Sequence, residues 1–242
     1  MNTVKGDHSK GFRWLMENGV HIYTNDETAD HFEVVTGEKM IGAPERIPFE
    51  VGGFKIVPFY LPHTSRTDEG ELVPCPNFGY LIQSEEMGTL LYATDMQVMA
   101  KANGDGSLIN QYGSPIVWDM DRCPFIYEET NGMQLGLPVL LDFKSMRINH
   151  MLIETNYIFA ERFDIDSVKR RHVIRGHHSA EVCASFIKKN QTPDLRTVTL
   201  IHLSRDTDEE NILRQVKEVA GKRVDVAVAH PGLEVDLRRF PF

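Results

Sequence analysis

The chain has 242 residues, a formal net charge of −9 and 41% hydrophobic residues, enough to bury one large core or two small ones. The acidic balance argues against a protein that coats nucleic acid through overall charge, although it leaves room for a local basic patch. The three cysteines, Cys75, Cys123 and Cys183, form no CxxC pair, which argues against a disulfide framework or a cysteine-bound zinc. Neither a signal peptide nor an apolar run of membrane-spanning length is present, so we expect a cytoplasmic protein without a membrane anchor.

The first half of the chain predicts one helix and several strands. Residues 9–18 have apolar side chains at helical spacing and predict a helix, followed by a strand over residues 20–23. Residues 54–61 (FKIVPFYL) predict a strand that leads directly into Pro62-His63. Residues 79–93 predict a hairpin whose second strand leads into Thr94-Asp95.

Residues 99–147 differ from their surroundings, because glycine and proline punctuate them and their apolar pieces show no sustained period. We interpret them as an irregular insertion in a single domain that spans residues 1–242. Long irregular segments in compact folds are often functional, so this insertion could cover a site as a lid or form the contact of a homodimer.

Regular elements resume after the insertion. Strands and helices alternate there, with strands over residues 148–154, 197–202 and 224–229 and helices over residues 166–174, 179–190 and 208–220. Such alternation indicates a layered α/β fold.

Polar residues capable of binding a metal follow three of the predicted strands. His63, Asp95 and His202 each come directly after an apolar strand, and strands that run in the same direction would bring them to one edge of a sheet. Asp7 and His8 add a carboxylate and an imidazole just before a helix. Zinc accepts this mixture of nitrogen and oxygen ligands, as do manganese and iron. Each residue alone is more often a loop, cap or core residue, so the hypothesis depends on their coincidence.

Several motifs resemble the metallo-β-lactamase superfamily. Residues 6–11 (GDHSKG) look like the second half of its HxHxDH signature, and four blocks follow in the family's order: FKIVPFYLPH, LLYATDM, RGHHSAE and LIHLS. The GHHS block resembles the ribonuclease Z-like and YycJ-like branch, as does HMLIETN, a strand that ends in an acidic residue. The resemblance covers nearly the whole chain except residues 99–147.

This resemblance implies an αββα sandwich, N-terminally incomplete, that contains a hydrolase site with one or two zinc ions, or manganese or iron. Asp7, His8 and His202 would hold one ion, Asp95 would bridge, and His63 would help to hold the other. A hydroxide activated by the metal would attack a phosphorus or carbonyl centre. By the same resemblance, His177 would contact the substrate phosphate or protonate the leaving oxygen, and Asp7 would act as a catalytic carboxylate. Ser179 and Arg171 would be further substrate contacts.

The chain departs from the family's pattern at its beginning. Thr3 and Lys5 stand where HxHxDH has its first two histidines, and neither side chain replaces an imidazole as a ligand. The strands that the family would place before this motif are also absent. Three explanations remain open: a fragment or misplaced start, a natural degenerate relative, or a partner chain that supplies the missing strands.

The most basic stretch is Lys169-Arg170-Arg171-His172 with Arg175 nearby, just before His177. It is either a solvated helix face or a rim that holds a substrate phosphate. The sequence therefore predicts a metal-dependent hydrolase and favours a phosphodiesterase that acts on nucleic acid or on a phosphate-containing small molecule such as a cyclic nucleotide. The alternatives are a thioesterase or glyoxalase-like hydrolase of the same superfamily, or a catalytically impaired remnant with a binding or assembly role.

Overall fold

The computed structural model describes residues 11–37, 39–67, 69–110, 112–116, 138–159 and 173–239. Its centre is a seven-stranded sheet in the order β11-β10-β9-β8-β7-β4-β3. In chain order these strands are β3 (Phe49–Val51), β4 (Phe54–Tyr60), β7 (Phe78–Ser84), β8 (Gly88–Ala93), β9 (His150–Glu154), β10 (Thr197–Ile201) and β11 (Asp225–Val228). Strands β8 to β11 run parallel to one another, whereas β3, β4, β7 and β8 pair antiparallel.

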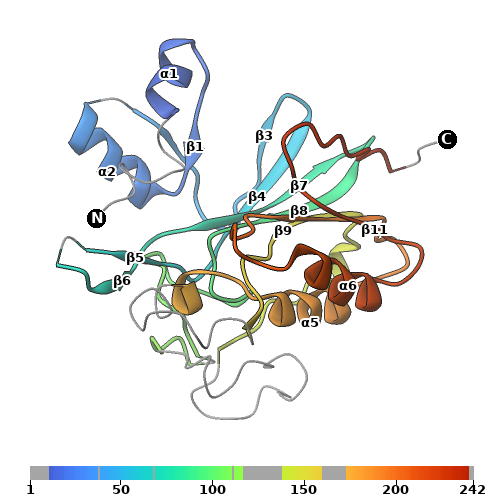
Figure 1. Cartoon of the computed structure of the whole chain (residues 1–242). Coiled ribbons are helices and arrows are strands. Elements are labelled where there is room, and N and C mark those ends of the chain that lie inside the picture. The colour runs from blue at the N-terminus through green and yellow to red at the C-terminus, as the bar shows by residue number, and fades with distance from the viewer. Residues whose placement is uncertain are drawn as a thin grey trace.

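Two helices cover one face of this sheet, and Figure 1 shows both beneath it: α5 (Ala180–Asn190) and α6 (Glu209–Ala220). Each begins with a side-chain cap that satisfies a free backbone N–H group. The Ser179 hydroxyl accepts from the Val182 N–H, and the Asp208 carboxylate accepts from the Asn211 N–H. Acidic residues in the first turn and lysines in the last turn of both helices also oppose the helix dipole.

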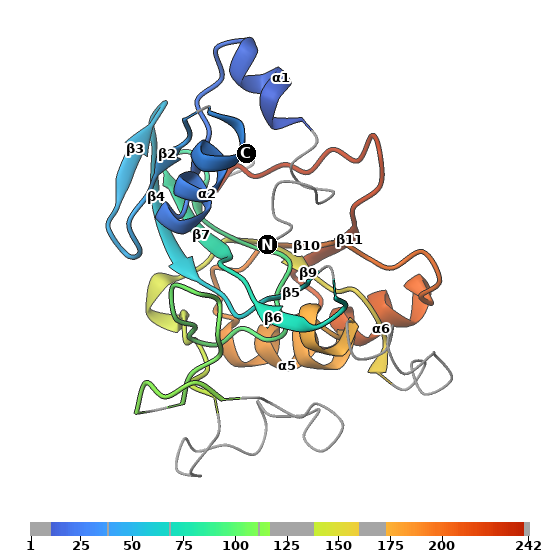
Figure 2. The ribbon, with the colours of Figure 1, turned by 90° about the vertical axis from the view of Figure 1, so that its left-hand side faces the viewer.

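The N-terminal elements lie on the other side of the sheet from α5 and α6, as Figures 1 and 2 show. They are α1 (Phe12–Glu17), β1 (Tyr23–Thr24), α2 (Asp26–Thr36) and β2 (Ile41–Gly42), and β1 pairs with β2. A small separate core forms there around Ala29, Phe32 and Met40. A further two-stranded sheet is made by β5 (Thr64–Arg66) and β6 (Leu72–Pro74).

The main core lies between the sheet and the two helices. One row of apolar side chains crosses the sheet in register, because Leu81 pairs with Leu91, Leu91 with Met151, Met151 with Val198 and Val198 with Val226. Alternate residues of a strand face the same side, so this row meets α5 and α6. Leu91, Met151 and Val198 are completely buried. The row fixes the relative register of the strands, and therefore the place where each strand ends.

The predicted mixed α/β fold is confirmed, and most of the expected strands and helices are present. The described residues build one large sheet and two two-stranded ones, so they do not contain the second large sheet of the expected sandwich. The expected strand at residues 20–23 is reduced to β1, since only two residues pair there. The helix expected over residues 166–174 lies mostly outside the described residues, although residues 173–176 are helical.

The described parts of residues 99–147 contain isolated bridges and a single 3-10 turn, η1 (Lys144–Met146). Residues 117–137 of this predicted insertion, with Cys123, lie outside the described residues. No helix in the described ranges is long and apolar enough to cross a membrane.

Candidate metal centre

The ends of three neighbouring parallel strands place three polar side chains at one edge of the sheet. Asp95 follows β8, Glu154 is the last residue of β9, and His202 follows β10. The strands end together because Ala93 pairs with Ile153 and Glu154 with Ile201. The carboxyl ends of parallel strands are where ligand sites form in open α/β sheets.

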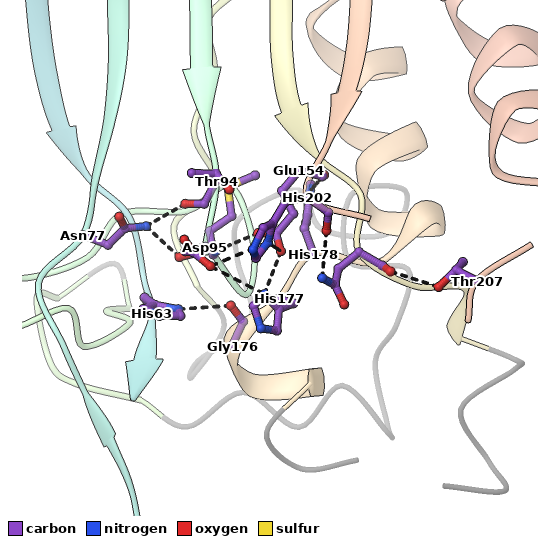
Figure 3. A network of polar contacts seen from close by, with 12 residues as sticks. His63, Asn77, Thr94, Asp95, Glu154, Gly176, His177, His178, His202 and Thr207 are labelled. Carbon is purple, nitrogen blue, oxygen red and sulfur yellow. Dashed lines mark hydrogen bonds and ion pairs between the residues drawn. The ribbon is translucent and has the colours of Figure 1, made fainter. Parts of the chain in front are cut away.

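His177 joins these residues from the segment before α5, and Figure 3 shows all four side chains converging. They form the one group of at least three candidate metal ligands found among the described residues, with all ligand atoms within 4.8 Å of one another. The Asp95 Oδ1 atom lies 3.8 Å from His177 Nδ1 and 3.6 Å from His202 Nδ1. Glu154 Oε1 lies 2.7 Å and 2.8 Å from the same two nitrogens.

Glu154 holds the centre of this group. Its side chain is completely buried, and its Oε1 accepts hydrogen bonds from the Nδ1–H groups of His177 and His202, while Oε2 accepts from the Met96 backbone N–H at 3.0 Å. Burial on its own would raise the pKa of Glu154, but the hydrogen bonds from the two histidines outweigh burial and hold that pKa below its ordinary value. Glu154 is therefore ionised, and an ionised carboxylate fixes the orientation of both imidazole rings.

Asp95 and His202 both have a left-handed backbone, with φ values of 51° and 59°. This conformation is uncommon outside glycine, although aspartate, asparagine and histidine tolerate it best. Two asparagine side chains hold it in place, because Asn77 donates to the carbonyl oxygens of Thr94 and Asp95, and Asn156 donates to that of His202. Such locally unfavourable backbone tends to occur at functional sites.

His63 follows β4, which runs in the same direction as β8 because the antiparallel β7 lies between them. The His63 Nδ1–H donates to the Gly176 carbonyl at 3.1 Å, so Nε2 carries the lone pair. Burial lowers the pKa of His63 below its ordinary value and keeps the ring neutral. The centroids of the His63 and His177 rings are 6.2 Å apart. His63 thus borders the four-residue group without belonging to it.

The remaining predicted site residues lie elsewhere. Ser179 is completely buried, and its hydroxyl caps α5. Its neighbour His178 is also buried and donates from Nδ1 to the Glu154 carbonyl; burial lowers the pKa of His178 to about 4. The predicted metal ligands Asp7 and His8 and the predicted substrate contact Arg171 lie outside the described residues.

The donor set suits a divalent cation. Two imidazoles and two carboxylates are ligands that zinc, manganese and iron accept. A tetrahedral ion with ligands at about 2.1 Å separates them by about 3.4 Å. The four nitrogen–oxygen separations, from 2.7 to 3.8 Å, lie on either side of that value. The two short ones are hydrogen bonds from Nδ1–H groups to Glu154. A protonated ring nitrogen has no lone pair for a metal, so a cation would be held through Nε2 of the histidines or would have to replace the Nδ1 protons.

The sequence matches no protein-family model and no curated protein. Its structure resembles solved structures, among them an isothiocyanate hydrolase from Delia radicum gut bacteria, with a TM-score of 0.52 and 13% identity over 96% of this chain and 72% of that one. Unliganded yeast PDE1 matches with a TM-score of 0.53 and 11% identity over 87% of this chain and 58% of that one. Both are metallo-β-lactamase-fold proteins. This chain has the metallo-β-lactamase fold.

A third metallo-β-lactamase-fold protein, YhfI from Bacillus subtilis, matches over 87% of this chain with 16% identity and a TM-score of 0.49. The chain spans 62% of the length of YhfI and 58% of that of yeast PDE1. At these identities the likeness concerns the fold alone. The ribonuclease Z-like branch stays a prediction from the sequence motifs.

Glu154 is the residue that sequence reasoning left without a role. A signal for it is nevertheless present in the sequence, since the predicted strand over residues 148–154 ends in this glutamate. Its position in register with the strand before His202 makes it a neighbour of both Asp95 and His202.

Proposed function

We propose that the protein is a metal-dependent hydrolase that cleaves phosphodiester bonds, in nucleic acid or in a small molecule such as a cyclic nucleotide. The observation that carries the proposal is the convergence of Asp95, Glu154, His177 and His202 at the carboxyl edge of parallel strands. The fold supports a hydrolase as well, because the isothiocyanate hydrolase shares it. The choice of phosphodiesters rests on the GHHS block that contains His177.

In this proposal Asp95 and His202 hold a divalent cation, zinc or manganese, together with His63 and the Asp7-His8 pair predicted from the sequence. When bound, such a cation activates water and neutralises the charge that develops on a phosphoryl oxygen. Glu154 is a positioning residue that fixes the tautomer and direction of both imidazoles, as carboxylates behind metal-bound histidines do.

In this proposal His177 is the general acid that donates a proton to the leaving group. Its Nδ1–H donates to Glu154, so Nε2 is the ring nitrogen that would carry a proton to the oxygen of the leaving group. Its side chain is 13% exposed, so water is largely excluded from it.

Turnover of bis-p-nitrophenyl phosphate tests the proposal. Protein supplied with zinc or manganese should hydrolyse this generic phosphodiester, and Asp95→Ala and His202→Ala should each abolish the reaction. Exposed Glu218 on α6 offers a matched control, so Glu218→Ala should leave turnover unchanged. Unchanged turnover in both site variants would end the catalytic claim. Protein that neither binds a cation nor turns over any ester would favour a binding or assembly role instead.

A further inference from the structure

A pocket of about 220 Å³ adjoins the candidate metal centre. His63 lies in its wall, and so does Arg175, which precedes the Gly176 carbonyl that His63 contacts. Most of the remaining wall is apolar and comes from segments far apart in the sequence, including Leu72 on β6, Leu108 and Ile116. Pockets for drug-sized ligands measure roughly 300–1,000 Å³, so this one suits a single compact group.

Arg175 gives this pocket its charge. Arg175 is half-buried, and within the described ranges it has neither a hydrogen bond nor an ion pair with another residue. A guanidinium withdrawn from water is stabilised by a carboxylate, phosphate or other oxyanion that accepts from its planar N–H groups. Since the protein supplies no such partner there among these residues, an anionic ligand is the group that complements it. Because the chain has a net charge of −9, an anion is attracted to a local positive group such as Arg175 and not to the protein as a whole.

We propose that the pocket binds the non-reacting part of the substrate, and that this part is a compact apolar group, the size of one ring, that carries a negative charge for Arg175. The apolar wall packs against the ring, and the guanidinium donates hydrogen bonds to the oxyanion. The proposal rests on the proposed function for its place beside the reacting centre. It narrows the substrate to a small organic anion, because a polynucleotide would need a longer groove.

Binding of benzenesulfonate tests this proposal without any turnover. Its sulfonate pairs with a guanidinium but coordinates divalent cations weakly, so the probe reports on Arg175 rather than on the metal. Two matched ligands separate the contributions: benzenesulfonamide keeps the ring without the charge, and methanesulfonate keeps the charge without the ring. Ligand-observed NMR titrations of the full-length protein, with the metal content of each preparation measured, give the three dissociation constants.

We expect benzenesulfonate to bind at least tenfold more tightly than either matched ligand. Arg175→Gln should weaken benzenesulfonate at least tenfold and leave benzenesulfonamide within twofold. Leu72→Trp should fill the pocket and weaken both aromatic ligands. Arg223→Gln is the matched control, because Arg223 is exposed before β11, at the opposite end of the strands.

The proposal is overturned if Arg175→Gln binds benzenesulfonate as well as the unmodified protein does, or if the three ligands bind equally. It is also overturned if Leu72→Trp leaves binding of the aromatic ligands unchanged. Failure of the proposed function looks different: no preparation would hydrolyse bis-p-nitrophenyl phosphate, while the binding pattern at Arg175 would still be observed.

Discussion

Asp95 Oδ1 and His202 Nδ1 lie 3.6 Å apart across the end of β9, and both residues have a left-handed backbone. Glu154, the last residue of β9, occupies the strand between them. Both carbonyl oxygens are held by asparagine side chains, from Asn77 and Asn156. The backbone at this sheet edge thus holds a carboxylate and an imidazole facing each other.

The Asp95→Asn variant should remove the negative charge of residue 95 and keep its left-handed backbone conformation. Asparagine tolerates the left-handed region as well as aspartate does, so we expect the free energy of unfolding of the metal-free protein to change by less than about 1 kcal/mol. The affinity for manganese should fall at least tenfold, since an amide oxygen is a weaker ligand than a carboxylate. Urea unfolding and calorimetric titration measure the two quantities. Unchanged affinity would remove Asp95 from the metal site.

Glu154→Gln should impair both the stability of the site and its affinity for a cation. Glutamine keeps the size, but its NH₂ group cannot accept from an imidazole N–H or from the Met96 N–H, so a buried donor loses its partner at a cost of about 1–3 kcal/mol. Loss of a carboxylate that orients metal-binding histidines typically weakens metal binding about 10- to 100-fold. Glu218→Gln on α6 is the control for both measurements. An equally stable Glu154→Gln protein with full affinity would show that this carboxylate orients nothing.

His177 and His202 both donate to Glu154, yet the proposal gives them different roles. His202→Ala should lower both metal content and turnover. His177→Ala should retain the metal and lose turnover by roughly 10²- to 10⁴-fold, the usual contribution of a general acid. Metal analysis of both purified variants, with rate measurements, distinguishes the roles. If His177→Ala loses the metal as His202→Ala does, His177 is a ligand and the proton must come from another group.

Stability should decline on mild acidification because of His150, at the other end of β9 from the metal centre. Burial lowers the pKa of His150, whose ring contacts the Thr197 hydroxyl. In the unfolded chain the pKa of His150 lies near 6.5, so below about pH 6.5 the unfolded chain binds a proton at His150 that the folded chain does not bind. The free energy of unfolding is therefore unaffected by this residue above that pH and decreases below it. Urea unfolding at pH 8 and pH 5.5 should show a smaller loss for His150→Asn than for the unmodified protein. Equal losses would place the acid sensitivity elsewhere.

The strand ends were predictable from the sequence because they follow apolar segments with clear periodicity. Those segments became β4, β8 and β10, and the polar residues after them, His63, Asp95 and His202, lie at the same edge of the sheet. Helices α5 and α6 could also be predicted from the sequence, since their caps and apolar faces are local signals.

The features that could not be predicted from the sequence depend on contacts between residues far apart in the chain. The place of Glu154 in the candidate metal centre depends on the register of the strands. Its pairing with Ile201 brings it between His177 and His202, which come from distant segments. Helix α2 was not predicted, since few of its residues are buried and its packing partners lie in the small N-terminal core. The pocket beside Arg175 joins residues from several separate segments, so only the folded chain reveals it.

Anomalous diffraction from crystals grown with manganese or zinc would locate a cation bound by Asp95 and His202. We expect one strong peak, about 2.0–2.2 Å from a carboxylate oxygen of Asp95 and a ring nitrogen of His202, and no such peak in Asp95→Ala crystals. A fully occupied cation bound away from both side chains, or none in crystals of protein that binds the metal in solution, would contradict this expectation.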